Sequence, residues 1–184
     1  MKIRIRDIPP EGRTLEWSLD LDSLQRRLVP ESEGGPARKL VMPEYVFSAP
    51  PPATVQLELE GSTVMIDGTV SAQFRTNCVR CLEPTNASIQ SPVKMVLKPH
   101  SERSRPDEEV EDVQLGFYDG KEVDCAPIVE ESLVLTLPLN VVCSESCRGL
   151  CPTCGSNLNE GACRCAPAKD GDERFSVLRG LKIQ

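Results

Sequence analysis

Cysteines at metal-ligand spacing are the residues of this sequence that could do chemistry. The chain has nine cysteines. Eight of them fall in short clusters, which are Cys78 and Cys81, Cys143 and Cys147, Cys151 and Cys154, and Cys163 and Cys165. In Cys151-Pro-Thr-Cys154-Gly155, two thiolates on a tight turn can face one ion, and the glycine permits a positive φ. Because tetrahedral thiolate sites select zinc by softness and geometry, we expect Zn²⁺, as one or two ions.

The spacing leaves open which cysteines share an ion. One partition makes a first site of the first four clustered cysteines and a second site of the last four: Cys78, Cys81, Cys143 and Cys147, then Cys151, Cys154, Cys163 and Cys165. A rival partition joins the two Cys-x-x-Cys pairs, as zinc ribbons do, and leaves the other four to a second ion. A third builds a single site within 147–165 and leaves Cys78 and Cys81 as spare thiols. Cys125 stands alone, and we expect a buried structural thiol there.

Length and composition fit one ordinary domain with a small appendage. The chain has 184 residues, of which 39% are hydrophobic and only 4% aromatic. Its 16 prolines and 12 glycines indicate many turns. A net charge of −7 argues against a protein that coats nucleic acid non-specifically, because phosphate contacts depend on Lys and Arg.

Neither a signal peptide nor a membrane span is expected. Residues 1–7 alternate charged and apolar side chains and contain no apolar h-region. No run reaches the roughly 18 apolar residues of a transmembrane helix. We therefore expect a cytoplasmic protein that does not contact membranes. In that compartment thiols stay reduced, and paired cysteines more often bind metal than form disulfides.

Alternating apolar residues predict a mainly antiparallel sheet. We expect strands near residues 3–5, 15–21, 40–47 and 89–97, and the clearest signal is a hairpin formed by 55–60 and 64–74. The return strand of this hairpin leads directly into Cys78. Asp22 is expected to begin a short helix that ends near Leu28, and residues 124–137 have the spacing of a packed helix that Pro138 ends.

These elements predict an α+β fold, in which a mainly antiparallel β-sheet or partial barrel carries one packed helix and a C-terminal cysteine-rich zinc-binding module. The β-rich domain covers 1–140, with loop-like segments at 33–39 and 102–124. The zinc module covers 141–168, and a basic tail covers 169–184.

No pattern in the sequence supports an enzyme. Four-thiolate sites are coordinatively closed, whereas hydrolytic zinc keeps an open position. The single histidine, His100, has no partner residues at metal-ligand or catalytic spacing, and we expect it to be exposed and inert. Nucleotide-binding and nucleophile motifs are absent from the sequence, so we expect no catalytic residues and no small-molecule substrate.

Two segments resemble the bacterial YceD family, the large ribosomal RNA subunit accumulation proteins. The first is Asn77-Cys-Val-Arg-Cys-Leu-Glu-Pro84, and the second is Cys147-Arg-Gly-Leu-Cys-Pro-Thr-Cys-Gly-Ser-Asn-Leu-Asn159. An acidic stretch and Glu130-Glu-Ser-Leu-Val-Leu-Thr-Leu-Pro138 lie between them, and a segment ending in Leu178–Lys182 follows. The resemblance implies a cytoplasmic bacterial protein that is needed for synthesis or processing of large-subunit ribosomal RNA, and it implies no catalytic residues.

We therefore expect a non-enzymatic assembly factor that binds precursor ribosomal RNA or a basic ribosomal protein. The candidate RNA contacts are Arg148, Arg164, Arg174, Arg179 and Lys182, and the candidate protein contact is the acidic segment 108–112. One alternative is a nuclease or thiol-redox enzyme, which would lose activity but not its fold when a cysteine is changed. Another is a zinc-finger regulator of DNA, but residues 155–162 offer few base-reading side chains.

Overall fold

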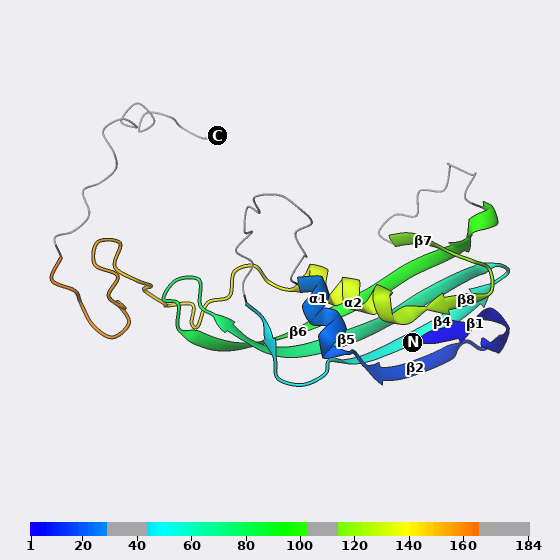
Figure 1. Cartoon of the computed structure of the whole chain (residues 1–184), viewed down its shortest axis with the longest axis horizontal. Helices are drawn as coiled ribbons and strands as arrows, with labels where there is room; N and C mark the ends of the chain where they lie inside the picture. Colours follow the sequence, from blue (N-terminus) through cyan, green and yellow to red (C-terminus); the bar gives the residue numbers. More distant parts are fainter. Residues whose placement is uncertain (29–43, 103–113, 166–184) are drawn as a thin grey trace, which may run out of the picture.

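The computed structural model describes residues 1–28, 44–102 and 114–165, which form an α+β structure (Figure 1). The strands are β1 (Lys2–Arg4), β2 (Arg13–Ser18), β3 (Val46–Phe47), β4 (Pro52–Glu60), β5 (Thr63–Asn77), β6 (Pro84–Pro99), β7 (Gln114–Tyr118) and β8 (Glu122–Asp124). The helices are α1 (Leu21–Leu28) and α2 (Cys125–Thr136), with short 3₁₀ turns η1 (Ile5–Asp7) and η2 (His100–Glu102). The fold class expected from the sequence is thus confirmed at the level of α+β.

A six-stranded sheet forms the body of the molecule. Its order is β2-β4-β5-β6-β7, and β3 pairs with β5 beside this path. All of these pairs are antiparallel except β6 and β7, which run parallel. β1 and β8 form a separate antiparallel pair, which joins the start of the chain to the segment before α2.

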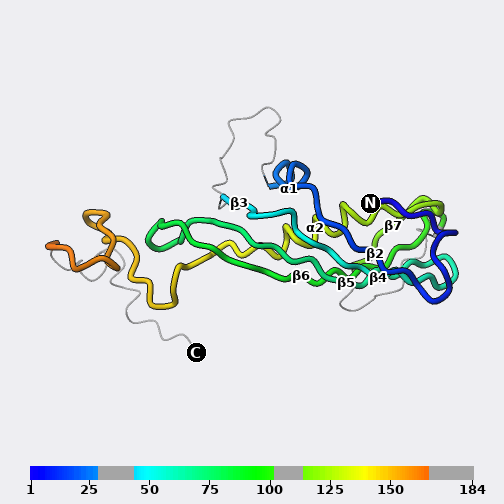
Figure 2. The backbone as a smooth tube through the Cα atoms, turned by 90° about the horizontal axis from the view of Figure 1, so that it is seen from below, coloured from blue at the N-terminus to red at the C-terminus, as the bar shows by residue number. Residues whose placement is uncertain are grey.

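The alternation of apolar and polar residues decides which sheet face is covered. Val55 and Leu57 of β4, and Val64, Ile66 and Val70 of β5, are all at most 2% exposed, while their neighbours face outward. Because successive strand residues point to opposite faces, this pattern gives one apolar face and one polar face. Leu24 of α1 and Leu133 of α2 belong to the same core cluster as the apolar face. The two helices lie on one side of the sheet (Figure 2).

Helix α2 begins and ends where its sequence dictates. The side chain of Asp124 accepts a hydrogen bond from the N–H of Ala126 at 3.3 Å, which satisfies a donor of the first turn. Proline lacks a backbone N–H, and Pro127 is tolerated in the first turn because N–H groups there have no intrahelical acceptor. Pro138 follows the last turn and cannot continue the helix. Glu130, only 5% exposed, accepts from Ser23 Oγ at 3.0 Å and from Arg27 Nε at 2.8 Å. This buried carboxylate fixes α1 against α2.

The long hairpin of β5 and β6 positions the first cysteine pair. These strands have 15 and 16 residues, and their far ends lead into the turn that carries Cys78 and Cys81. The chain that leaves α2 runs beside the hairpin toward the same end of the molecule (Figures 1 and 2). A backbone hydrogen bond of 2.9 Å from Val79 N to Val141 O joins the two segments. The cysteine-rich segment is thereby brought to the tip of the hairpin.

The structure corrects two sequence-based expectations. The interval 102–124, expected to be loop-like, contains β7 and β8; its acidic composition and Gly116 masked two short strands. Two helices pack on the sheet instead of one. The expectation of a mainly antiparallel sheet is confirmed, with β7 as the one described strand that joins the sheet in parallel. The strand expected at 40–47 is observed as β3 at residues 46–47, and its part before residue 44 lies outside the described residues. The expected loop at 33–39 and the expected tail at 169–184 also lie outside the described residues.

Replacing Glu130 by alanine tests the link between the helices. Hydrogen bonds to charged groups contribute about 1.5–3 kcal/mol each, and the partner Arg27 is 38% exposed, which favours the lower end of that range. Since two such bonds are lost, we expect the free energy of unfolding to fall by about 3 kcal/mol in urea denaturation. Glu131→Ala, at the exposed neighbouring position, is the matched control and should stay within about 0.5 kcal/mol of the parent chain. Equal losses in the two variants would contradict a special role of the buried carboxylate.

Candidate metal centre

The structure brings the eight clustered cysteines together in two groups. Site 1 consists of Cys78, Cys81, Cys143 and Cys147, and site 2 of Cys151, Cys154, Cys163 and Cys165. Within each group all four sulfur atoms lie within 4.8 Å of one another. This grouping follows the first of the partitions that the spacing left open. Each group could hold a metal ion.

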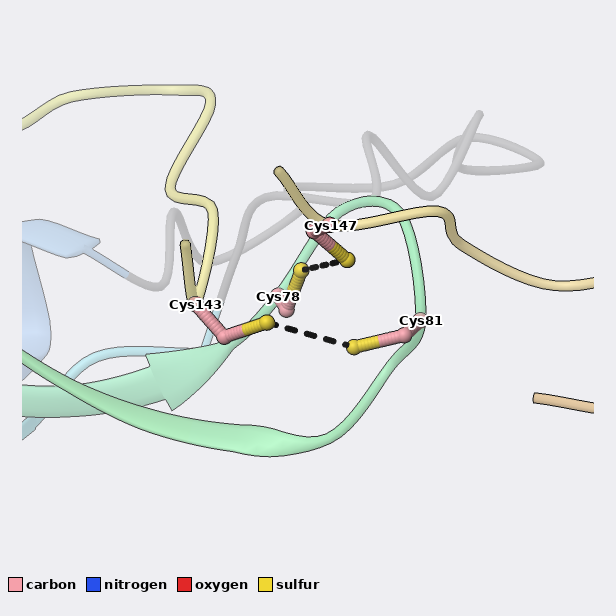
Figure 3. A group of neighbouring side chains, drawn as sticks. All are labelled: Cys78, Cys81, Cys143 and Cys147. Carbon is pink, nitrogen blue, oxygen red and sulfur yellow. Dashed lines mark hydrogen bonds between the residues drawn. The ribbon is translucent and has the colours of Figure 1, made fainter. Parts of the chain in front are cut away.

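The sulfur atoms of site 1 have the separations of a tetrahedral site. Cys78 Sγ lies 3.8 Å from Cys147 Sγ, and Cys81 Sγ lies 3.7 Å from Cys143 Sγ (Figure 3). A tetrahedron with Zn–S bonds of about 2.3 Å has sulfur–sulfur edges of about 3.8 Å. A disulfide would require about 2.05 Å, and all of these cysteines are free thiols. The donor set therefore fits a divalent ion.

Site 1 joins two segments that are distant in the sequence. The partners in its two close sulfur pairs are 69 and 62 positions apart. Cys78 and Cys81 come from the hairpin turn, and Cys143 and Cys147 come from the segment after α2 (Figure 3). Three of the four are buried, and Cys143 is exposed. A metal here would close a long loop and fix the end of the chain to the sheet.

The two Cys-x-x-Cys turns share one backbone geometry. In the first, Arg80 N donates to Cys78 Sγ at 3.4 Å, and in the second, Thr153 N donates to Cys151 Sγ at the same distance. The residue after each second cysteine has a positive φ, 62° at Leu82 and 72° at Gly155. The N–H of that residue donates to the carbonyl of the first cysteine at 2.9 Å in both turns.

Backbone donors favour the thiolate form of the first cysteine in each turn. Burial raises the pKa of the Cys78 thiol, but hydrogen bonds from the N–H groups of Cys81, Cys143 and Arg80 outweigh it and lower that pKa to about 6. In the second turn, hydrogen bonds from the N–H groups of Cys154 and Thr153 lower the pKa of Cys151 to about 6. Since the thiolate is the form that binds metal, both turns are preorganised for it.

Site 2 is more open than site 1. Cys151 is its one buried ligand; Cys154 is exposed, and Cys163 and Cys165 are partly exposed. Cys163 Sγ lies 3.4 Å from Cys151 Sγ, and Cys154 Sγ lies 3.2 Å from Ser156 Oγ. Among the described residues after Cys151, no side chain is buried. The segment therefore lacks an apolar core of its own.

Arg80 links the two segments of site 1 through hydrogen bonds, a role that was not predicted from the sequence. Its Nη1 donates to the carbonyl oxygens of Glu145 at 3.2 Å and Cys147 at 3.0 Å. The carbonyl of Arg80 accepts from Leu150 N at 3.0 Å. Gly149 has a φ of +73°, and a Cβ there would lie 2.9 Å from the Arg80 carbonyl oxygen. The position of Arg80 inside the first Cys-x-x-Cys pair was the available signal.

The other residues singled out in the sequence belong to neither group of four cysteines. Arg148 and Arg164 are exposed, and neither forms an ion pair within the described ranges. Arg174, Arg179 and Lys182 lie outside the described residues.

Cys125 is fully buried, as expected, and burial raises the pKa of its thiol to about 11. His100 is exposed and stacks on Phe117 with a centroid distance of 5.9 Å. In the part of the chain that the structure describes, no helix has the length and apolarity to cross a membrane.

Comparison with known proteins identifies the family. Residues 66–182 match the family described as "Large ribosomal RNA subunit accumulation protein YceD". The match covers both cysteine groups and all but the first three residues of the hairpin that carries the first of them. The chain belongs to the YceD family. The resemblance seen in the cysteine segments is thereby confirmed.

Curated relatives come from plants and mycobacteria. A chloroplastic YCED homolog 1 of Arabidopsis thaliana, named as a large ribosomal RNA subunit accumulation protein, is 24% identical over 77% of this chain and 51% of its own length. The Zea mays homolog of the same name is 27% identical over 63% of this chain and 48% of its own length. An uncharacterised Mycobacterium tuberculosis protein is 30% identical over 56% of this chain and 49% of its own length. The chain spans about half the length of these relatives. No solved structure matches it.

Leu82→Gly tests the strain in the first turn. A left-handed conformation costs a residue with a side chain about 1–2 kcal/mol, and the greater freedom of glycine in the unfolded chain offsets part of the gain. The side chain is 62% exposed, so its loss removes little burial. We expect the free energy of unfolding to rise by about 0.5 kcal/mol in urea denaturation with metal present.

Val79→Gly is the matched control for that turn. Val79 is 45% exposed and, unlike Leu82, does not have a positive φ. Glycine there should destabilise the protein by about 0.5–1 kcal/mol. Destabilisation of the same size at both positions would show that the conformation of Leu82 is not strained.

Proposed function

We propose that this chain is a non-enzymatic ribosome-biogenesis factor that supports synthesis or processing of large-subunit (23S) ribosomal RNA. The observation that carries the proposal is membership of the YceD family across both cysteine groups. The names of the plant relatives refer to accumulation of the large ribosomal RNA subunit and to no reaction. A cytoplasmic location is part of the proposal, since bacterial ribosomes are assembled there.

Both sites are proposed to bind Zn²⁺ in a structural role. Four thiolates complete a tetrahedral shell and leave no position for water or substrate, which supports a structural role over a hydrolytic one. The sulfur separations of site 1 fit zinc, and thiolate softness favours it over magnesium or calcium. Bound zinc would supply the folding free energy that the segment after Cys147 does not obtain from apolar burial.

The proposed direct partner is precursor ribosomal RNA or a basic ribosomal protein. Exposed Arg148 and Arg164, beside the sulfur clusters, support RNA, together with the cationic residues of 169–184. The net charge of −7 supports a basic protein, for which the acidic segment 108–112 is the proposed contact. The sheet and the two sites would then act as a scaffold that presents these groups.

Elemental analysis of anaerobically purified protein tests the metal assignment. We expect two zinc ions per chain, and one after the double substitution Cys163→Ser with Cys165→Ser, because two of the four ligands of site 2 are lost. Cys125→Ala is the matched control, since Cys125 belongs to neither site, and it should retain both ions. Absence of zinc from the parent protein, together with an unchanged fold in strong chelator, would contradict the assignment.

Deletion of the gene in its host tests the cellular role. We expect sucrose gradients to show fewer large subunits and precursor large-subunit RNA to accumulate, with restoration by the parent gene. Ultraviolet crosslinking from cells separates the two partners: recovered precursor RNA identifies RNA as the contact, and recovered basic protein without RNA identifies protein. Unchanged large-subunit levels in the deletion strain would overturn the proposed function.

A further inference from the structure

The side chain of Asn159 connects the two metal sites. Asn159 lies in the loop between Cys154 and Cys163, both of which belong to site 2. Its amide Nδ2 nevertheless donates to the sulfur of Cys147, in site 1, at 3.4 Å. A residue whose position depends on one site thus hydrogen-bonds a ligand of the other.

The orientation of this amide follows from its partners. The backbone N–H of Arg148 donates to Asn159 Oδ1 at 2.8 Å, so the oxygen must face Arg148 and the nitrogen must face the sulfur. The second amide hydrogen is donated to Asn157 Oδ1 at 2.9 Å. That atom also accepts from the backbone N–H of Asn159 at 3.1 Å, which identifies it as the oxygen. Each polar atom of the Asn159 amide therefore has a partner.

The loop that carries Asn159 is attached to its neighbours by a few backbone hydrogen bonds, and cysteines of site 2 lie on both sides of it. Leu158 N donates to Gly149 O at 2.9 Å, and Cys151 N donates to Ser156 O at 2.8 Å. No side chain of 152–165 is buried. Because the loop has no apolar core, an ion shared by its cysteines would be the main restraint on its conformation.

We propose that the two sites bind metal cooperatively, with Asn159 as the positioning residue that couples them. An ion in site 2 orders the loop and places the amide donor on Cys147, where the hydrogen bond stabilises the thiolate that holds the ion of site 1. By linkage, an ion in site 1 strengthens site 2 by the same factor. Loss of a hydrogen bond to a metal ligand typically lowers metal affinity about 10- to 100-fold, and this is the coupling expected here. The inference rests on the two metal sites of the proposed function.

The coupling can be tested in a competition experiment. The protein and a chromophoric chelator compete for Zn²⁺ under anaerobic reducing conditions, and the affinity of each site is measured. Asn159→Asp keeps an oxygen for the Arg148 N–H, but it replaces the donor to Cys147 by a carboxylate oxygen that repels the thiolate. We expect this change to weaken site 1 about 10- to 100-fold in the otherwise intact chain. When site 2 is removed by Cys163→Ser with Cys165→Ser, site 1 is weakened to a similar extent, and Asn159→Asp then has little further effect. This non-additivity measures the coupling.

Two control variants distinguish loss of the coupling from a general loss of metal binding. Asn86→Ala, at an exposed asparagine on β6, should leave both affinities unchanged. In the double variant Cys78→Ser with Cys81→Ser, where site 1 is lost, Asn159→Asp should not alter site 2. The coupling is overturned if the parent protein binds two ions but the zinc affinity of site 1 is the same with and without site 2. The two metal sites of the proposed function would then still stand. Failure of the parent protein to bind any zinc overturns both, and neither result depends on the ribosome phenotype.

Discussion

The convergence of four sulfur atoms from two distant segments is the constraint on which the rest of the structure depends. Site 1 joins the tip of the β5–β6 hairpin to the chain that leaves α2, across sequence separations of 62 and 69 positions. Cross-links that close long loops stabilise a fold chiefly by restricting the unfolded chain. Three of the four cysteines are buried, and among the described residues the only other hydrophobic residue packed against their cluster is the partly buried Val142. In the proposed zinc-bound protein, sulfur–metal bonds would take the place of hydrophobic packing at this end of the molecule.

The sheet is the rigid element that positions the first two cysteines of site 1. Strict alternation along β4 and β5 buries one face beneath α1 and α2, and the register runs without interruption from Val64↔Leu97 to Asn77↔Pro84. Since a one-residue slip would turn the buried face outward, the register is strongly determined. The location of Cys78 at the hairpin tip is therefore fixed by the core at the other end of the strands.

The fold class, the hairpin and the eight cysteines that gather in groups could be predicted from the sequence, because each depends on local spacing. The grouping of the cysteines could not, since it depends on how α2 returns the chain along the hairpin. β7 escaped prediction because its pairing with β6 is non-local and its neighbourhood is acidic. Arg80 donates to a carbonyl 67 positions away, and its position inside a Cys-x-x-Cys pair was the one local signal of that role. Asn159 donates to a sulfur atom 12 positions earlier, and no short motif reveals that contact.

The distance along the chain between the two halves of site 1 has a consequence for biosynthesis. Translation proceeds from the N-terminus, so Cys78 and Cys81 leave the ribosome well before Cys143 is made. During that interval the nascent hairpin presents two thiols without their partners, and the fold is completed only when the last quarter of the chain emerges. If site 1 holds zinc as proposed, the ion can gain its four sulfur ligands only after Cys147 has been made, so synthesis would be the stage most sensitive to metal shortage.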